Sequence, residues 1–211
     1  WSLLDTGSGA LVAHEPDNSL LEMTFSSTPS GGIARATSFR PHHYTPGNSL
    51  FAAITFNFFD QVTDCVKYAG LWSFDTVTNE HGIRFEATGT DLQWRLDSDT
   101  DAPDSLVTQD QWNVDKLDGT GPSGITLDIS TVQIAVIDMQ ALYVGRVRVG
   151  FNIGGMAVIC HEFNHANTVQ YPYINNASLS VTCGMECTGT VTTEMNFICA
   201  AVKDEGDGGT G

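Results

Sequence analysis

The stretch that decides the fold is Gly145–Phe163, which reads GRVRVGFNI-GG-MAVICHEF. Apolar residues stand at every second position from Val147 to Ile153, with arginine, glycine or asparagine between them. A period of two residues is typical of a half-buried strand. Gly154 and Gly155 accept the positive φ of a tight reversal. We therefore expect the two halves of the stretch to pair as a β-hairpin.

Similar segments follow one another along the chain, and no convincing amphipathic helix interrupts them. Ser49–Phe59 alternates in the same way, and Val132–Asp138 is apolar at almost every position, as in a strand buried on both faces. Further strands are expected at Leu20–Phe25, Leu71–Asp75, Gly82–Ala87, Asp91–Leu96, Leu179–Cys183, Gly189–Thr193 and Phe197–Val202. This spacing predicts an all-β, antiparallel two-sheet sandwich of the jelly-roll or concanavalin-like type, with about 10–13 strands.

The length favours one sandwich domain over residues 1–202. Residues 203–211 have the polar, glycine-rich composition of an acidic tail or linker. The sequence begins at Trp1 rather than Met, so we expect a processed chain or a piece of a longer one. No apolar run approaches about 18 residues, so no membrane insertion is expected.

The chain is strongly acidic because bases are scarce. Nine Lys and Arg oppose 25 Asp and Glu, for a net charge of −16, although charged residues make up only 16% of the chain. Nucleic-acid binding without sequence preference needs a basic face that displaces counterions, so nucleic acid is not an expected partner. Electrostatic docking on an anionic membrane is excluded for the same reason.

The five cysteines are Cys65, Cys160, Cys183, Cys187 and Cys199. An odd, loosely spaced set does not match a disulfide framework, so buried free thiols are the main expectation. A single Cys183–Cys199 or Cys183–Cys187 link is the alternative. No second pair accompanies Cys183 and Cys187 at the spacing of a zinc ribbon.

The most specific motif is HEFNH (His161–His165), which matches H-E-x-x-H. On a helix this spacing holds Zn²⁺ between two imidazoles, with Glu162 as general base. Here the motif ends a predicted strand, on which His161 and His165 would lie about 13 Å apart. We therefore expect no zinc site and keep a zinc hydrolase only as a weak alternative.

A second candidate metal site is the acidic stretch DSDTDAPD (Asp97–Asp104). Asp97, Asp99 and Asp101 have the spacing of a calcium loop, but Ala102 stands where an EF-hand requires glycine. We expect a solvated acidic turn and no cofactor. An irregular Ca²⁺ site is the weak alternative.

Two sets of residues are candidates for contacts with other subunits. Arg146 and Arg148 share one strand face, where they would either hold an acidic neighbour or lie on a solvated face of the sheet. Asp118 and Ser123 belong to a glycine-rich loop whose backbone they can hydrogen-bond. Such a loop either presents a fixed surface to a partner or serves as a long structural crossover between the sheets.

For carbohydrate binding, the candidates are the tryptophans Trp72, Trp94 and Trp112, which would stack on sugar rings if exposed. Support for this use comes from fold analogy alone. No pair of carboxylates is suggested for glycosidase chemistry, and the chain has neither a nucleophile elbow nor a phosphate loop. The sequence therefore predicts a protein that is not an enzyme.

Two longer phrases lie within Trp112–Asn167, namely WNVDKLDGTGPSG from Trp112 and VGRVRVGF from Val144. In these phrases the chain resembles a family of virion structural proteins of tailed bacteriophages, often marine, and of some large algal viruses. Within that family HEFNH accompanies the sandwich fold, and no catalytic residue is supplied.

The resemblance implies a non-enzymatic virion protein that is capsid-associated or part of a tail or fibre. Such a protein would contact copies of itself and other virion proteins, and it would be made in the host cytoplasm before entering the particle. The alternative function is a lectin-like module for host-surface glycans.

Overall fold

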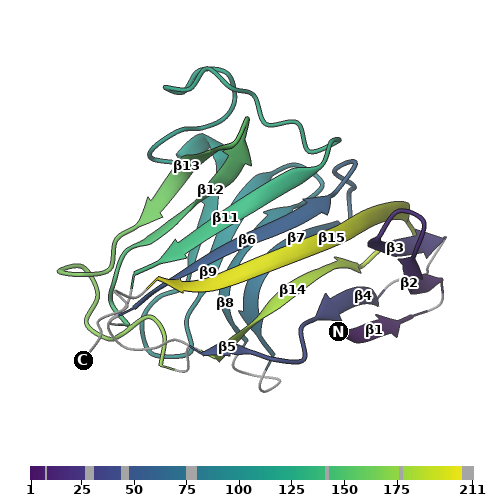
Figure 1. Cartoon of the computed structure of the whole chain (residues 1–211), viewed down its shortest axis with the longest axis horizontal. Helices are drawn as coiled ribbons and strands as arrows, with labels where there is room; N and C mark the ends of the chain where they lie inside the picture. Colours follow the sequence, from purple (N-terminus) through teal and green to yellow (C-terminus); the bar gives the residue numbers. More distant parts are fainter. Residues whose placement is uncertain are drawn as a thin grey trace.

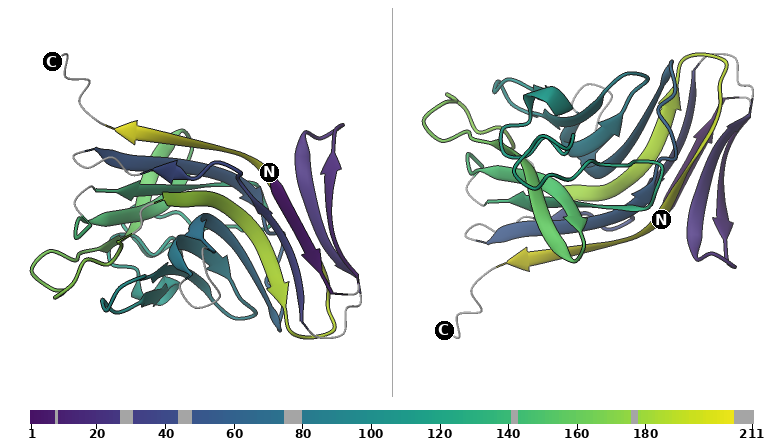
Figure 2. Two further views of the ribbon diagram at one scale, coloured as in Figure 1. Left: turned by 90° about the horizontal axis from the view of Figure 1, so that it is seen from below. Right: turned by 90° about the horizontal axis from the view of Figure 1, so that it is seen from above.

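The computed structural model of the chain describes residues 1–7, 9–26, 31–43, 48–74, 80–140, 143–175 and 178–205. Within them, fifteen strands form two antiparallel sheets that pack face to face (Figure 1). Figure 2 shows the two layers from the side, with the long strand β14 curving along its length. The predicted all-β, two-sheet sandwich is confirmed. Among the described residues, no helix is long and apolar enough to cross a bilayer.

The eight-stranded sheet has the order β1-β4-β14-β7-β8-β9-β10, and β5 pairs with β14. Its strands are β1 (Ser2–Thr6), β4 (Gly32–Thr37), β5 (His42–His43), β7 (Cys65–Ser73), β8 (His81–Ala87), β9 (Leu92–Asp97), β10 (Ser105–Thr108) and β14 (Ser178–Cys187). A short 3-10 helix, η1 (Gln109–Gln111), follows β10.

The seven-stranded sheet has the order β13-β12-β11-β6-β15-β3-β2. Its strands are β2 (Ala10–Glu15), β3 (Leu20–Ser26), β6 (Ser49–Asn57), β11 (Gln133–Met139), β12 (Val147–Ile153), β13 (Met156–Phe163) and β15 (Thr192–Glu205). Neighbours in this order, from β13 to β15, run side by side across the front of Figure 1. The predicted hairpin is confirmed, because β12 pairs with β13 across Gly154 (φ 62°) and Gly155 (φ 84°).

The C-terminal strand differs from the predictions, and the ends of two predicted segments lie outside the described residues. The predicted strands Gly189–Thr193 and Phe197–Val202 are not separate, because one strand, β15, begins at Thr192 and continues through the second segment, with a register shift between Phe197 and Cys199. β15 also runs past the predicted domain end at residue 202, while residues 206–211 of the predicted tail lie outside the described residues. The end of the predicted strand Leu71–Asp75, at Asp75, lies outside them as well.

An aromatic cluster fills the space between the sheets. Phe85 of β8 packs edge-on against Phe151 of β12, with ring centroids 5.0 Å apart, and lies 5.3 Å from the ring of Trp94. Trp112 lies within 6.5 Å of both phenylalanines. Trp94 and Trp112 are core residues, 0% and 3% exposed. The prediction that these two tryptophans stack on sugars is therefore wrong.

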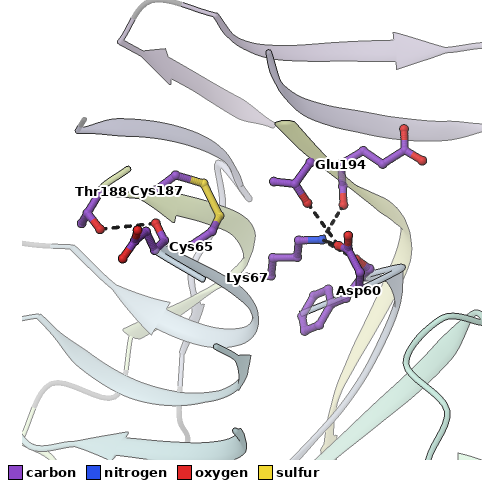
Figure 3. The surroundings of a disulfide bond; sticks show 9 residues. Asp60, Cys65, Lys67, Cys187, Thr188 and Glu194 are labelled. Carbon is purple, nitrogen blue, oxygen red and sulfur yellow. Dashed lines mark hydrogen bonds and ion pairs between the residues drawn. A yellow bond between two sulfur atoms is a disulfide. The ribbon is translucent and has the colours of Figure 1, made fainter. Parts of the chain in front are cut away.

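A disulfide joins Cys65 and Cys187, which face each other on β7 and β14 (Figure 3). The expectation of buried free thiols is therefore wrong for this pair, and both alternative links through Cys183 are wrong. Cys160 and Cys183 are free and buried, and Cys199 is free and exposed. Chain spacing does not indicate the pair, because 122 residues separate the two cysteines.

A lysine is buried beside this disulfide (Figure 3). Lys67 of β7 is 1% exposed, and its Nζ donates to the carbonyl oxygens of Phe58 (2.6 Å) and Glu194 (2.9 Å). It also contacts the carboxylate of Asp60. Burial lowers the pKa of Lys67, and Asp60 opposes that shift. Since Glu194 belongs to β15, this ammonium group links the two sheets.

Candidate functional site

The outer face of the eight-stranded sheet, turned away from the core, carries large polar and aromatic side chains. On β4, β7, β8, β9 and β14 these residues alternate with core residues. We call them the outer polar face: Arg35, Tyr68, Trp72, Arg84, Glu86, Gln93, Arg95, Asp97, Thr182 and Glu186. The alternation that predicts strands also predicts outward polar residues, but it does not indicate that neighbouring side chains would cover them.

Glu86 lies at the centre of the outer polar face. Strand register places it between Tyr68 on β7 and Gln93 on β9. Its carboxylate, 1% exposed, accepts hydrogen bonds from Arg84 Nε (2.7 Å), Arg95 Nε (3.0 Å) and Gln93 Nε2 (2.6 Å). A buried carboxylate is costly unless it is paired and hydrogen-bonded. Two guanidinium groups and an amide supply those partners here.

Arg84 and Arg95 are direct cross-strand partners on β8 and β9. Like charges placed opposite each other on neighbouring strands repel, and the shared carboxylate of Glu86 offsets this repulsion. The Cζ of Arg84 also lies 4.6 Å from the ring centroid of Tyr68 and 4.0 Å from that of Trp72. These cation–π contacts and the bond to Glu86 hold the Arg84 guanidinium in one orientation.

Three glycines interrupt the side-chain layer, namely Gly70, Gly82 and Gly184 on β7, β8 and β14. A Cβ at Gly70 would lie 2.3 Å from the carbonyl oxygen of Ile83, and one at Gly82 would lie 2.2 Å from that of Leu71. Neighbouring strands therefore approach each other too closely on this side for any residue but glycine.

Three buried polar atoms of this face have no hydrogen-bond partner: Arg84 Nη1, Asp97 Oδ1 and Thr182 Oγ1. Asp97 Oδ1 does lie 3.6 Å from Arg95 Nη1, which is an ion-pair contact beyond hydrogen-bond distance. Among the described residues, only Asn196 Oδ1 shares this property elsewhere. Buried polar atoms are nearly always hydrogen-bonded, so three exceptions on one face indicate a place where a ligand or ordered water completes the bonding.

The outer polar face is hollowed beside Trp72. The hollow has a volume of about 320 Å³ and is lined by Thr37, Pro41, Trp72, Ser73, Phe74, Ser178 and Ser180. The ring of Trp72 is 1% exposed, lies under Arg84, and donates through Nε1 to Glu80 at 3.3 Å. Trp72 thus borders a hollow, but the predicted exposed stacking surface is wrong for this tryptophan too.

The two arginines expected at a subunit contact are already paired within the chain. Arg148 Nε donates to Asp138 at 2.9 Å, and Arg146 Nη1 lies 3.5 Å from Glu162 Oε1. Arg148 stands on β12 and Arg146 directly precedes it, so both belong to the seven-stranded sheet and not to the sheet that carries the outer polar face. Their role in contacts with another subunit stays a prediction.

The glycine-rich loop is organised by a residue that sequence reasoning missed. Asp115, 4% exposed, accepts a hydrogen bond from the backbone N–H of Ser123 at 2.7 Å. Asp118 accepts from the N–H of Thr120 at 2.8 Å, and hydrogen bonds from Thr120 lower the pKa of Asp118. The loop is therefore held by its own contacts, and its use as an interface stays a prediction.

His161 and His165 line one hollow at the end of β13, yet their tautomers do not suit a shared metal. His161 Nδ1 accepts from the N–H of Asn113 (3.3 Å), so the neutral ring carries its proton on Nε2. His165 Nδ1 donates to the carbonyl of Gly145 (2.8 Å), which leaves Nε2 as an acceptor. Only one of the two rings thus offers a lone pair at Nε2.

The three candidate calcium ligands have different surroundings. Asp97 belongs to the outer polar face, Asp99 accepts from the N–H of Asn175 at 2.7 Å, and Asp101 is exposed. Within the described ranges, no group of three or more His, Cys, Asp or Glu is placed to hold a metal ion. The structure therefore does not bring these carboxylates together, and Ca²⁺ binding stays an untested alternative.

Acidification from pH 7.5 to about 5 is expected to destabilise the fold through the two histidines. Burial lowers the pKa of His161 and of His165 below the usual value near 6.5. In this window the unfolded chain binds more protons, so the stabilisation present above about pH 6.5 is lost as pH falls. The slope reaches at most about 1.4 kcal/mol per pH unit for each histidine.

Urea unfolding at a series of pH values measures this slope. The double variant His161→Gln, His165→Gln should flatten it, while His14→Gln, at an exposed position, should keep the parent slope. An unchanged slope in the double variant would contradict the assignment of this pH dependence to His161 and His165.

No family model and no curated protein matches this sequence. Solved structures do match the fold. An endo-β-1,4-glucuronan lyase from the fungus Trichoderma reesei is 11% identical, with 98% of this chain and 87% of that chain covered and a TM-score of 0.57. A Bacillus licheniformis β-glucanase is 10% identical, with 98% of this chain and 92% of that chain covered and a TM-score of 0.55. The lectin UEA-II, complexed with galactose, is 11% identical, with 96% of this chain and 92% of that chain covered and a TM-score of 0.53.

Identities this low show a shared fold alone, and they confirm the predicted jelly-roll, concanavalin-like class. They also overturn the prediction that the chain is not an enzyme, because a lyase and a glucanase are among the proteins that share this fold. The prediction had rested on the absence of sequence motifs. None of the three matches bears on a virion, so that family stays a prediction.

Proposed function

We propose that the outer polar face of the eight-stranded sheet binds a carbohydrate. The observation that carries this proposal is the set of three unpartnered polar atoms on that face. Arg84 Nη1 is a donor, Asp97 Oδ1 is an acceptor, and the hydroxyl of Thr182 is both. Sugar hydroxyls donate and accept, so a polyhydroxylated ligand matches this mixed set.

Glu186 is the next residue suited to a sugar hydroxyl. It is half-buried, and its Oε1 accepts a hydrogen bond from the hydroxyl of Tyr68 at 3.2 Å. Burial and the charge of Glu186 raise the pKa of Tyr68, so this hydroxyl stays protonated and keeps donating. Tyr68 therefore orients the carboxylate of Glu186.

The names of the similar structures support a carbohydrate as the ligand. They include a lectin in complex with galactose, a β-glucanase and a glucuronan lyase. Sites of this kind place a few fixed polar groups in a concave surface, as the outer polar face does beside its hollow. Cleavage of the bound glycan is a separate question, which product analysis of the same mixtures answers.

Binding is tested by affinity electrophoresis of the purified chain through gels that contain one polysaccharide each. The panel includes β-glucans, galactans and polyuronates. We expect retardation by at least one of them, and we expect Thr182→Val to weaken it about tenfold because one hydrogen bond is lost. Thr55→Val, on the opposite sheet, is the matched control and should bind as the parent does. No retardation by any member of the panel would overturn the proposal.

We further propose that this face is carried on a virus particle. This second proposal rests on the resemblance of the two phrases within Trp112–Asn167 to virion structural proteins. Such a chain would contact copies of itself and other virion proteins. Immunogold labelling of virus particles with an antibody against the chain tests this location, and particles without label would contradict it.

A further inference from the structure

We propose that Arg84 and Arg95 together clamp an anionic substituent, so that the glycan bound at the outer polar face is an acidic one. This inference rests on the proposed function and names the class of its ligand. A carboxylate and a sulfate ester share the relevant chemistry, because both present charged oxygens in a geometry that guanidinium groups match.

Each of the two guanidinium groups uses only part of its donors within the chain. Arg84 and Arg95 both donate Nε to the same carboxylate, that of Glu86, at 2.7 and 3.0 Å. A guanidinium has five N–H donors, so the Nη groups remain. Arg84 Nη1 has no hydrogen-bond partner, and Arg95 Nη1 reaches only an ion-pair contact of 3.6 Å with Asp97.

Both guanidinium groups are fixed before a ligand arrives. Glu86 is held in turn by Gln93, and Arg84 lies over the rings of Tyr68 and Trp72. Both side chains are partly exposed, that of Arg84 by 12% and that of Arg95 by 34%, while Arg84 Nη1 itself is a buried atom at the base of the face. A fixed pair of donors loses little conformational freedom on binding.

The basic residues of the outer polar face also favour an anionic ligand. Glu86 supplies one negative charge for two opposed guanidinium groups, and Arg35 adds a third cation to the same face. Asp97 and Glu186 balance this charge overall. Even so, three of the nine basic residues of a chain with net charge −16 are gathered on one face. Glu86 already offsets the repulsion between Arg84 and Arg95 through their Nε groups. An anion at their Nη groups would add a second charged acceptor, which a neutral hydroxyl cannot do.

The experiment compares two tetrasaccharides by isothermal titration calorimetry. β-1,4-linked tetraglucuronate and cellotetraose share a backbone and differ only in having a carboxylate or a hydroxymethyl group at C6. We expect the parent chain to bind tetraglucuronate at least about tenfold more tightly, the effect of one charge-assisted hydrogen bond. Sulfated cellotetraose is the third arm, and tighter binding to it than to tetraglucuronate assigns the clamp to sulfate.

The variants Arg95→Gln and Arg84→Lys should each remove the preference for the acidic ligand. Arg95 is the safer position for the fold, because its side chain is the more exposed of the two, and thermal unfolding checks both variants. Arg148→Gln, which alters another strand arginine paired with a carboxylate, is the matched control and should keep the preference. Equal affinity of the parent for acidic and neutral tetrasaccharides overturns this inference and leaves the proposed function intact. Failure to bind any glycan of the panel overturns both.

Discussion

Replacing both Cys65 and Cys187 by alanine is expected to lower the free energy of unfolding by about 4–5 kcal/mol. The disulfide closes a loop with a sequence separation of 122 residues, and a loop of that length restricts the unfolded chain strongly. The two cysteines also join β7 to β14 near the middle of the eight-stranded sheet. Urea unfolding of the double variant and of the oxidised parent at pH 7.5 measures the difference.

The control is Cys199→Ser, which changes a free, exposed cysteine. It should shift the free energy of unfolding by no more than about 0.5 kcal/mol. The parent in dithiothreitol should lose about as much stability as the double variant. If the reduced and oxidised parents unfolded at the same urea concentration, the bond would not contribute as proposed.

The substitution Lys67→Ala is expected to cost about 3–5 kcal/mol of stability. It removes the donor from the buried carbonyl oxygens of Phe58 and Glu194 and leaves a cavity between the sheets. The carboxylate of Asp60 loses its partner as well, although its side chain is 55% exposed and solvent compensates part of that loss. Thermal and urea unfolding give the change.

Two further variants separate the causes. Lys67→Met keeps most of the volume and donates no hydrogen bond, so it should recover the cavity part and cost about 1–3 kcal/mol. Lys203→Ala removes an exposed lysine from β15 and should change stability by about 0.5 kcal/mol or less. Equal effects of the variants at Lys67 and Lys203 would contradict a link between the sheets.

The strands that alternate strictly are the ones that could be predicted from sequence. The hairpin around Gly154 and Gly155 is the best case, because alternation and turn chemistry agree there. β1, β2, β4, β5 and β10 were not predicted, since they are short and rich in small or polar residues. The number of strands is therefore larger than expected, while the class of fold is as expected.

The candidate site was missed for a physical reason. Arg84 and Glu86 stand at outward positions of a strand, where polar residues normally meet solvent. Their burial arises from partners on other strands, above all Gln93 and Arg95, and strand order is not readable from one sequence. The same limit hid the pairing of Cys65. Conversely, the pattern of His161–His165 was visible, but its chemistry depends on hydrogen bonds to Asn113 and Gly145.

All ten residues of the outer polar face stand on strands, and none stands on a loop. Each backbone position is fixed by ladder hydrogen bonds to its neighbours, so the groups that would meet a ligand are set by the scaffold itself. The loops around the face are then free to vary in length and composition without disturbing those groups. For protein engineering, the strand residues of this face can be kept while the surrounding loops are exchanged, and the loops would set how many sugar units fit.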